Sequence, residues 1–378
     1  MAARLGVARE RRAGETRAAL TPETAKKLTG LGFAVTVETG TGEGSSIPDA
    51  DYLAAGAAIA PNAEAALSDA DLVLAVRGPD PALLKPGAVL VAMLNPYGDP
   101  AAAQALAERG VTAFAMEFVP RITRAQAMDV LSSQANLAGY RAVIEAAAAY
   151  GKGMPMMMTA AGTVSAAKVF VMGAGVAGLQ AIATARRLGG VVTATDVRPA
   201  AKEQVESLGA KFVAVQNEEF RSAETAAGYA REMSPEYQAE QAALVSEHVR
   251  KQDIVITTAL IPGRPAPKLL SAEHVASMRP GSVIVDMAVE QGGNVHGSQP
   301  DETVVTHNGV KIVAFSNLPA RVAADATALY ARNLLSFTGL LAKDGALAPD
   351  YEDEILKAAC LTRDGQVVHP ALQPKDAA

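Results

Sequence analysis

This sequence has few of the residues on which extracellular, metal-binding or membrane-spanning proteins depend. The single cysteine, Cys360, excludes an internal disulfide framework and a cysteine metal cluster, which predicts an intracellular protein without a metal site. No apolar run reaches the roughly 18 residues that a membrane helix needs, and the first residues, MAARLGVARERRAGE, lack the apolar core of a secretory signal. Neither absence excludes docking onto a membrane protein.

Basic blocks and N-terminal histidines are also missing. The net charge is −6 and no cluster of lysine and arginine stands out, which argues against a nucleic-acid partner. The first of the five histidines is His248, so the N-terminal region has no imidazole acid or base. With 20% charged and 49% hydrophobic residues, the 378-residue chain is typical of a globular protein with two domains.

The most informative segment reads KVFVMGAGVAGLQAIATARRLGGVVTATDVR. An apolar run is followed by Gly173, Gly175 and Gly178 in G-x-G-x-x-G spacing, then by a helix-like segment, a second apolar run and Asp196. The first glycine allows a tight turn, the second lets a pyrophosphate approach the backbone, and the third lets helix and strand pack closely. Asp196 is placed to accept hydrogen bonds from an adenosine ribose. The segment predicts a dinucleotide site; the alternative is a glycine-rich turn kept for packing alone.

Strand and helix signals alternate along the chain, which predicts an α/β protein with two doubly wound, Rossmann-like parallel-sheet domains joined by long helices. The segments DLVLAV (71–76) and KPGAVL (85–90) resemble DIVITT (253–258) and RPGSVI (279–284). We therefore expect both domains to share one plan, with the phosphate fingerprint only in the second. The alternative is that any parallel strand after a Pro-Gly turn looks like this.

Two long helical stretches mark where the chain passes between the domains. Ser132–Tyr150 is expected to lead into the second domain and Ala323–Leu341 to lead out of it. The predicted domains are therefore residues 1–132 with 322–378, and residues 133–321 carrying the dinucleotide. We expect the nicotinamide in a cleft between them.

Two loops are candidates for function. Residues 216–250 are too long for a minimal crossover, which is typical of a lid, although an extended surface loop is the alternative. The segment RITRAQAMDVLSS (121–133) brings together Arg121, Arg124, Gln126 and Asp129 just before the first long helix. Arginine binds phosphates or carboxylates, glutamine binds amides or ribose, and aspartate orients arginine; the alternative is a solvated loop that caps the helix.

These motifs resemble one known family, the soluble NAD(H)-binding component, or domain I, of proton-translocating nicotinamide nucleotide transhydrogenase. The resemblance covers nearly the whole chain, and its fold relative, alanine dehydrogenase, is the main rival. The matching segments, in chain order, are ERRAGETRAALTPE, MEFVPRITRAQAMDVLSSQANLAGYRAVI, MMMTAAGTV, the glycine fingerprint with QAIATA, ATDVR, KEQVESLG, AETAAGYAREM, ITTALIPG and NLPARVAADA.

The resemblance implies roles for named residues. A loop around the nicotinamide ring comprises Arg121, Gln126, Asp129 and Ser132. The pyrophosphate turn comprises Gly173, Gly175, Val176 and Gly178, and the stretch at the adenosine ribose comprises Asp196, Val197 and Arg198. A mobile loop that closes over the nucleotide contains Gly228, Tyr229 and Met233, and Leu260 lies in a stretch that borders the nucleotide.

Alanine dehydrogenase chemistry moves protons as well as a hydride, and it therefore needs an acid or base and cations for the substrate carboxylate. That family supplies an arginine, a lysine and a histidine from the first domain. Here the arginine is kept as Arg17, the lysine's strand offers Ala75 and Arg77, and Asn95 replaces the histidine. Arginine and asparagine cannot exchange protons near neutral pH, whereas hydride exchange between two nicotinamides needs only geometry. A third alternative is a non-catalytic NAD-sensing module.

The resemblance also implies the setting. We expect this chain to bind NAD(H), and a partner subunit to bind NADP(H), with direct hydride transfer between NADH and NADP⁺. The partners would be that NADP(H)-binding subunit and multi-span membrane subunits, with the chain itself a homodimer on the cytoplasmic face of the membrane. Because the sequence stops at Ala378 without a hydrophobic extension, it resembles the version in which this domain is a separate subunit.

Overall fold

The computed structural model describes residues 2–221, 233–261, 263–343 and 346–373. The chain divides into two compact units, Met1–Gln134 with Pro319–Ala378, and Ala135–Leu318. We call them the first and the second unit. The boundaries expected from the sequence lie two to three residues from these (132/133 and 321/322). In the described ranges, no helix has the length and apolar character needed to cross a membrane.

The first unit is built on an eight-stranded sheet in the order β19-β18-β6-β5-β4-β1-β2-β3. Strands β1 to β6 pair in parallel, and the C-terminal β18 and β19 add an antiparallel edge. The order 3-2-1-4-5-6 is that of the Rossmann fold. The strands are β1 Arg4–Val7, β2 Ala34–Glu38, β3 Ala58–Ala60, β4 Leu72–Arg77, β5 Val89–Met93, β6 Thr112–Ala115, β18 Cys360–Arg363 and β19 Gln366–Val367.

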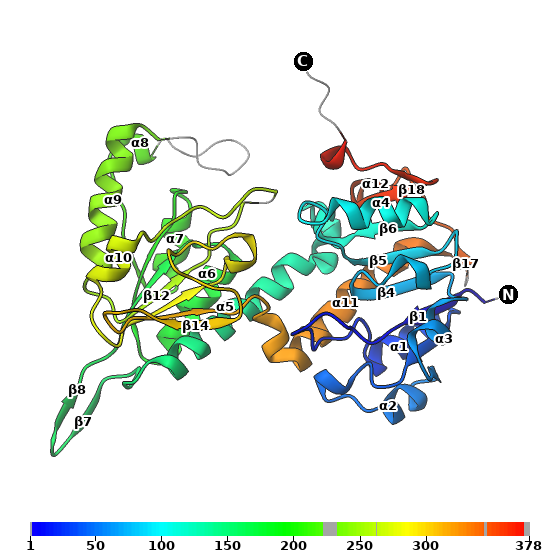
Figure 1. The fold of residues 1–378 in the computed structure, drawn as a ribbon, viewed down its shortest axis with the longest axis horizontal. Helices are drawn as coiled ribbons and strands as arrows, with labels where there is room; N and C mark the ends of the chain where they lie inside the picture. Colours follow the sequence, from blue (N-terminus) through cyan, green and yellow to red (C-terminus); the bar gives the residue numbers. More distant parts are fainter. Residues whose placement is uncertain (1, 222–232, 262, 344–345, 374–378) are drawn as a thin grey trace. The chain divides into compact units, whose positions relative to one another are not determined.

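Helices cover both faces of this sheet (Figure 1), so its central strands are almost continuously apolar. Helices α1, α2, α11 and α12 pack on one face, and α3 and α4 pack on the other. Thr21 caps α1 and Pro22 is its first residue, as the sequence predicts. The helices are α1 Pro22–Gly30, α2 Asp49–Ala54, α3 Ala63–Leu67, α4 Pro100–Glu108, α11 Ala323–Leu341 and α12 Glu354–Ala359.

The second unit repeats the plan with seven strands in the order β11-β10-β9-β12-β13-β15-β14. All neighbours are parallel except the edge strand β14. The order reverses between β9 and β12, which is where ligands bind in open α/β sheets. The strands are β9 Lys168–Met172, β10 Val191–Thr195, β11 Lys211–Phe212, β12 Ile254–Thr257, β13 Val283–Asp286, β14 Glu302–Val305 and β15 Lys311–Ala314.

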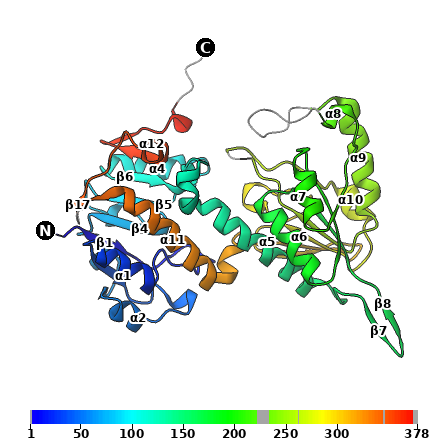
Figure 2. The ribbon, with the colours of Figure 1, turned by 180° about the vertical axis from the view of Figure 1, so that it is seen from behind.

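The helices of the second unit also lie on both sides of the sheet (Figure 2). Helices α5, α6 and α7 pack on one face, and α9 and α10 on the other. Much of the expected loop at 216–250 is helical, since α8 and α9 flank residues 222–232. The helices are α5 Val130–Ala149, which begins in the first unit, α6 Val176–Arg187, α7 Ala201–Ser207, α8 Glu218–Arg221, α9 Pro235–Val249 and α10 Ala272–Ser277.

One hairpin projects from the rest of the second unit (Figures 1 and 2). Its strands are β7 (Met157–Thr159) and β8 (Gly162–Val164), and every residue in them is exposed. Met158 is 78% exposed, and three other apolar side chains of this segment, those of Met156, Met157 and Val164, are also exposed. An isolated two-stranded hairpin is marginally stable in water, so this element is a candidate for contact with another chain.

Candidate functional site

The glycine fingerprint forms the turn between β9 and α6 in the second unit. Gly173 has φ +108°, and a Cβ there would lie 2.4 Å from the hydroxyl of Thr258. A Cβ at Gly178 would lie only 1.8 Å from the carbonyl oxygen of Gly173. Both positions therefore need glycine because the backbone of the turn, the helix and β12 meet there without room for a side chain.

Gly175 has a different reason to be glycine. It is the N-cap of α6, has ordinary backbone angles, and a Cβ there would meet no protein atom within 4 Å. No acidic side chain lies in the first turn of α6. The N–H groups of Val176, Ala177 and Gly178 thus begin a helix whose positive end is uncompensated and faces open space. That geometry suits an anion such as a pyrophosphate.

Asp196 follows β10 and lies beside this turn, but its carboxylate is already engaged by the protein. Its Oδ2 accepts a hydrogen bond from the N–H of Ala174 at 2.7 Å. The N–H of Arg198 donates to Oδ1 at 2.8 Å, and the Arg198 guanidinium contacts both oxygens at 2.9 and 3.0 Å. The pair therefore braces the glycine turn and offsets part of the charge of Asp196, while Val197 between them is 69% exposed.

The segment after β12 borders the same turn. The hydroxyl of Thr258 donates to the carbonyl of Gly173 at 3.1 Å, a link that the sequence interpretation did not assign. Leu260 and Ile261 follow it and are 49% and 43% exposed. The segment thus places two large apolar side chains outside the carboxyl end of β12. Exposed apolar groups at such a position are typical of a ligand site.

The expected lid falls largely outside the described residues. Gly228 and Tyr229 are among these, and nothing can be said of their placement. Met233 is partly buried against the core of the second unit. The carboxylate of Glu219 accepts hydrogen bonds from the N–H and hydroxyl of Ser234 at 2.5 and 2.7 Å. The two ends of segment 222–232 are therefore held together.

The loop 121–132 in the first unit separates into two groups of side chains. Asp129 caps α5, since its carboxylate accepts from the N–H and hydroxyl of Ser132 at 2.9 and 2.6 Å. Arg124 is bound to Asp353 at 2.7 and 3.1 Å, so it anchors the loop. Arg121 and Gln126 are exposed, and within the described ranges their side chains have no hydrogen-bond partner. These two remain available to a ligand.

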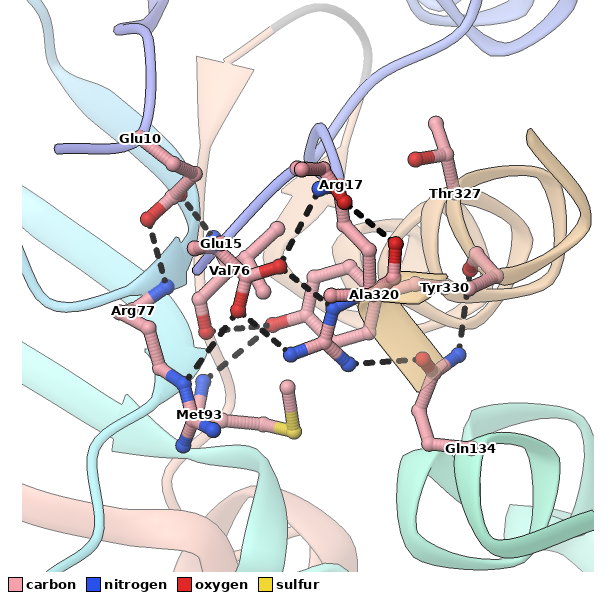
Figure 3. Close-up of polar contacts among 12 residues, drawn as sticks. Glu10, Glu15, Arg17, Val76, Arg77, Met93, Gln134, Ala320, Thr327 and Tyr330 are labelled. Carbon is pink, nitrogen blue, oxygen red and sulfur yellow. Dashed lines mark hydrogen bonds and ion pairs between the residues drawn. The ribbon is translucent and has the colours of Figure 1, made fainter. Parts of the chain in front are cut away.

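A charged cluster lies at the carboxyl ends of β1 and β4 in the first unit (Figure 3). Arg17, which is 3% exposed, donates to both oxygens of Glu15 at 2.7 Å and to the amide oxygen of Gln134 at 2.7 Å. Arg77 lies on the other side, with Nε 3.7 Å from the same Glu15 carboxylate. Both arginines therefore face an internal carboxylate.

Glu10 extends this cluster, and its ionisation was not anticipated from the sequence. Its carboxylate accepts from the N–H groups of Val76 and Arg77 at 2.6 and 3.2 Å. Burial raises the pKa of Glu10 from 4.5 to about 7, against the effect of these hydrogen bonds. Asn95 has φ +48°, and its N–H donates to the buried carboxylate of Glu117 at 2.7 Å. Within the described ranges, no group of histidine, cysteine, aspartate or glutamate residues is arranged to hold a metal ion.

Comparisons with known proteins match almost the whole chain. The description "Alanine dehydrogenase/PNT, N-terminal domain" matches residues 6–138, and "Alanine dehydrogenase/PNT, C-terminal domain" matches residues 142–370. The chain is 55% identical to the first portion of the NAD(P) transhydrogenase alpha subunit of Rhodospirillum rubrum, a separate chain there, over 98% of both chains. It is 32% identical to alanine dehydrogenase of Mycobacterium tuberculosis, over 97% of this chain and 94% of that protein.

Solved structures give the same order of similarity. A transhydrogenase structure from Sinorhizobium meliloti has a TM-score of 0.89 at 55% identity and covers 97% of this chain and 100% of its own. An L-alanine dehydrogenase structure has a TM-score of 0.80 at 26% identity, with 98% of each chain covered. The chain therefore belongs to the alanine dehydrogenase/PNT family, in the group of its NAD(P) transhydrogenase subunits.

Proposed function

We propose that this chain binds NAD(H) and takes part in direct hydride transfer between NADH and NADP⁺ held by a partner subunit. The observation that supports it best is the open N-terminus of α6, where glycines clear the space in front of unpaired N–H groups. Its family supplies the rest of the argument, because the relatives with higher identity are transhydrogenase subunits.

The nucleotide would lie along the carboxyl edge of the second unit's sheet. The turn at Gly173–Gly178 would bind the pyrophosphate, and the stretch Asp196–Arg198 would lie at the adenosine ribose. Leu260 would border the nucleotide from the β12 side. Gly228 and Tyr229 would close over it.

The nicotinamide supplies a hydride from its C4 atom, which becomes bound to C4 of the second nicotinamide, so that no solvent proton is consumed. The chain's task is then to orient one ring and exclude water. Arg121 and Gln126 have unbound polar groups for that purpose. Asp129 and Ser132 would position the loop, since their mutual hydrogen bonds cap α5.

An alanine dehydrogenase reaction fits the first unit less well. Asn95 and Arg77 stand where that family has its histidine and lysine, and neither exchanges protons near neutral pH. Arg17 is buried and bound to Glu15 and Gln134. Glu10 titrates near neutrality, but both its oxygens accept backbone hydrogen bonds. An assay with NADH, pyruvate and ammonium should therefore stay at background.

We also propose the assembly that the family implies. NADP(H) would be held by a partner subunit, and multi-span membrane subunits would anchor the chain at the cytoplasmic face. The exposed hairpin with Met156, Met157 and Met158 supports a homodimer, because flexible methionine side chains suit an apolar contact with a second chain. Sedimentation should give a dimer that Met158→Lys weakens.

The decisive experiment mixes this chain with an NADP(H)-binding partner domain and follows reduction of an NAD analogue by NADPH. Transfer that requires both proteins would support the proposal. If both nucleotides bind but nothing is transferred, the chain is an NAD-sensing module. Turnover of pyruvate and ammonium would favour the alanine dehydrogenase alternative.

A further inference from the structure

The segment after β12 is closed at its neck by one buried side chain, that of Asn294. Its Oδ1 accepts a hydrogen bond from the N–H of Ala259 at 3.1 Å. Its Nδ2 donates to the carbonyls of Ala259 and Pro267, both at 2.8 Å. Asn294 is fully buried, with 0% of its surface exposed. One carboxamide therefore fastens the beginning and the end of the segment 259–267.

Asn294 is itself held by a buried carboxylate. Asp286, the last residue of β13, is 0% exposed and accepts from the N–H groups of Ala288, Asn294 and Val295 at 3.0, 3.1 and 3.1 Å. The hydroxyl of Ser298 is its fourth donor, at 2.8 Å. With four donors the charge is well compensated, and the position of Asn294 relative to the sheet is determined.

A glycine turn makes this arrangement possible. Gly293 has φ +76°, and a Cβ there would lie 2.6 Å from Oδ2 of Asp286. The backbone can therefore approach the carboxylate only without a side chain at this residue. Gly293 thus belongs with the fingerprint glycines as a position where close backbone approach excludes other residues.

The fastened segment faces the phosphate-binding turn. Thr258, at its start, donates to the carbonyl of Gly173. Leu260 and Ile261 project from it with about half of their surfaces exposed, outside the carboxyl end of β12. This is the point between β9 and β12 where the strand order reverses and where ligands bind.

We infer that Asn294 is a positioning residue for the NAD(H) site: its carboxamide fixes the 259–267 segment so that Leu260 and Ile261 form an apolar wall of the nucleotide site. This inference rests on the proposed function, because the wall matters only if the chain binds a dinucleotide. Asn294 contacts no ligand in this account and acts through Ala259 and Pro267. Its effect on the nucleotide is therefore on affinity.

Asn294→Asp tests the inference because it changes hydrogen-bond chemistry at nearly constant shape. An ionised carboxylate can still accept from the Ala259 N–H, but it repels the two carbonyls that Nδ2 now binds. A protonated carboxyl regains one donor, and burial should bring its pKa into a measurable range. We expect NAD⁺ affinity, measured by calorimetry, to fall about tenfold at pH 8 and to return toward the wild-type value near pH 5.5. The wild-type affinity should not follow this pH profile.

Asn308→Asp is the matched control. Asn308 also uses Nδ2 to bind several carbonyls, those of Val275, Ala276 and Met278 at 3.2–3.3 Å. It precedes β15, at the opposite edge of the same sheet. This variant should lower the melting temperature as Asn294→Asp does, yet leave NAD⁺ affinity unchanged at every pH.

Two further results separate the possible failures. If Asn294→Asp loses stability as the control does but keeps its NAD⁺ affinity, the carboxamide only stabilises the fold and the inference is overturned. The double variant Leu260→Ala/Ile261→Ala, which alters exposed side chains, provides the test if Asn294→Asp does not fold: unchanged NAD⁺ affinity would also overturn it. Failure of the wild-type chain to bind NAD⁺ would instead refute the proposed function.

Discussion

The guanidinium of Arg198 contacts both carboxylate oxygens of Asp196, at 2.9 and 3.0 Å, beside the phosphate-binding turn. An isolated aspartate at this position would repel a 2′-phosphate and so favour NAD(H) over NADP(H). Here the arginine offsets part of that repulsion, and the aspartate also braces the turn through Ala174. The two residues must therefore be tested together.

The first prediction concerns this pair. Asp196→Ala should weaken NADH binding by about tenfold or more, because charge-assisted hydrogen bonds worth roughly 1.5–3 kcal/mol are lost, and should erode the preference over NADPH. Arg198→Met should strengthen discrimination against NADPH, since the aspartate charge is then uncompensated. Fluorescence titrations with both nucleotides measure this, with Arg187→Met on the exposed end of α6 as control. Equal wild-type affinity for NADPH would contradict the assignment.

The fingerprint glycines should fail in different ways. Gly178→Ala places a Cβ 1.8 Å from the Gly173 carbonyl, so the melting temperature should fall and binding should be lost with it. Gly175→Ala meets no protein atom within 4 Å, so the fold should keep its melting temperature while the new methyl group obstructs the pyrophosphate. Calorimetric melting and NADH titration of both variants separate the two roles. Full NADH affinity in Gly175→Ala would place the pyrophosphate elsewhere.

The arrangement of the two sheets was predictable because a local pattern occurs twice. Asp71 precedes β4 and accepts from the N–H of Arg4 at 2.7 Å, and Asp253 precedes β12 and accepts from the N–H of Lys168 at 2.9 Å. Each aspartate thus ties the start of a fourth strand to the start of a first strand. The repeated Asp and Pro-Gly signals in the sequence mark equivalent positions in the two sheets, so the shared plan is confirmed.

The details of the sites were not predictable, because they depend on contacts between distant segments of the chain. Arg124 appeared equivalent to Arg121 in the sequence, yet it binds Asp353, which is 229 residues away. Asp196 was expected to be free for a ribose, and its pairing with Arg198 requires the turn after β10 to fold back. Asn294 gave no signal, since its partners lie 27 and 35 residues away. One sequence carries no direct record of such pairings.

A third prediction follows from Glu10. Its folded-state pKa of about 7 lies above the ordinary value of 4.5, so the folded state binds more protons than the unfolded state between these values. Stability should therefore decrease as the pH rises from about 5 to 7.5, with a contribution of up to roughly 3 kcal/mol from this group. Burial lowers the pKa of His248 and His369, which opposes the trend, so the comparison must be made with a variant.

Glu10→Gln mimics the protonated carboxyl and should flatten the decrease. Denaturant unfolding of both proteins at pH 5, 6, 7 and 8 measures the difference in slope. Glu43→Gln, whose side chain is 64% exposed in the same region, should leave the wild-type slope unchanged. Parallel curves for the wild type and Glu10→Gln would mean that Glu10 titrates normally.

The last prediction concerns the loop before α5 and the transfer step itself. Gln126 is exposed with an unbound carboxamide, whereas Arg124 in the same loop is bound to Asp353. If Gln126 orients the nicotinamide, Gln126→Asn keeps the amide but withdraws it by one methylene, which misplaces the ring by enough to slow hydride transfer. We expect the transfer rate, measured by stopped-flow with NADPH and an NAD analogue, to fall at least about tenfold, while NADH affinity changes little. Arg121→Met should behave similarly, and Arg124→Met should change neither quantity. Asp129→Asn should slow transfer with a small loss of stability, since Asp129 also caps α5. Equal losses of rate and affinity in Gln126→Asn would show that the loop only binds the nucleotide and does not align it.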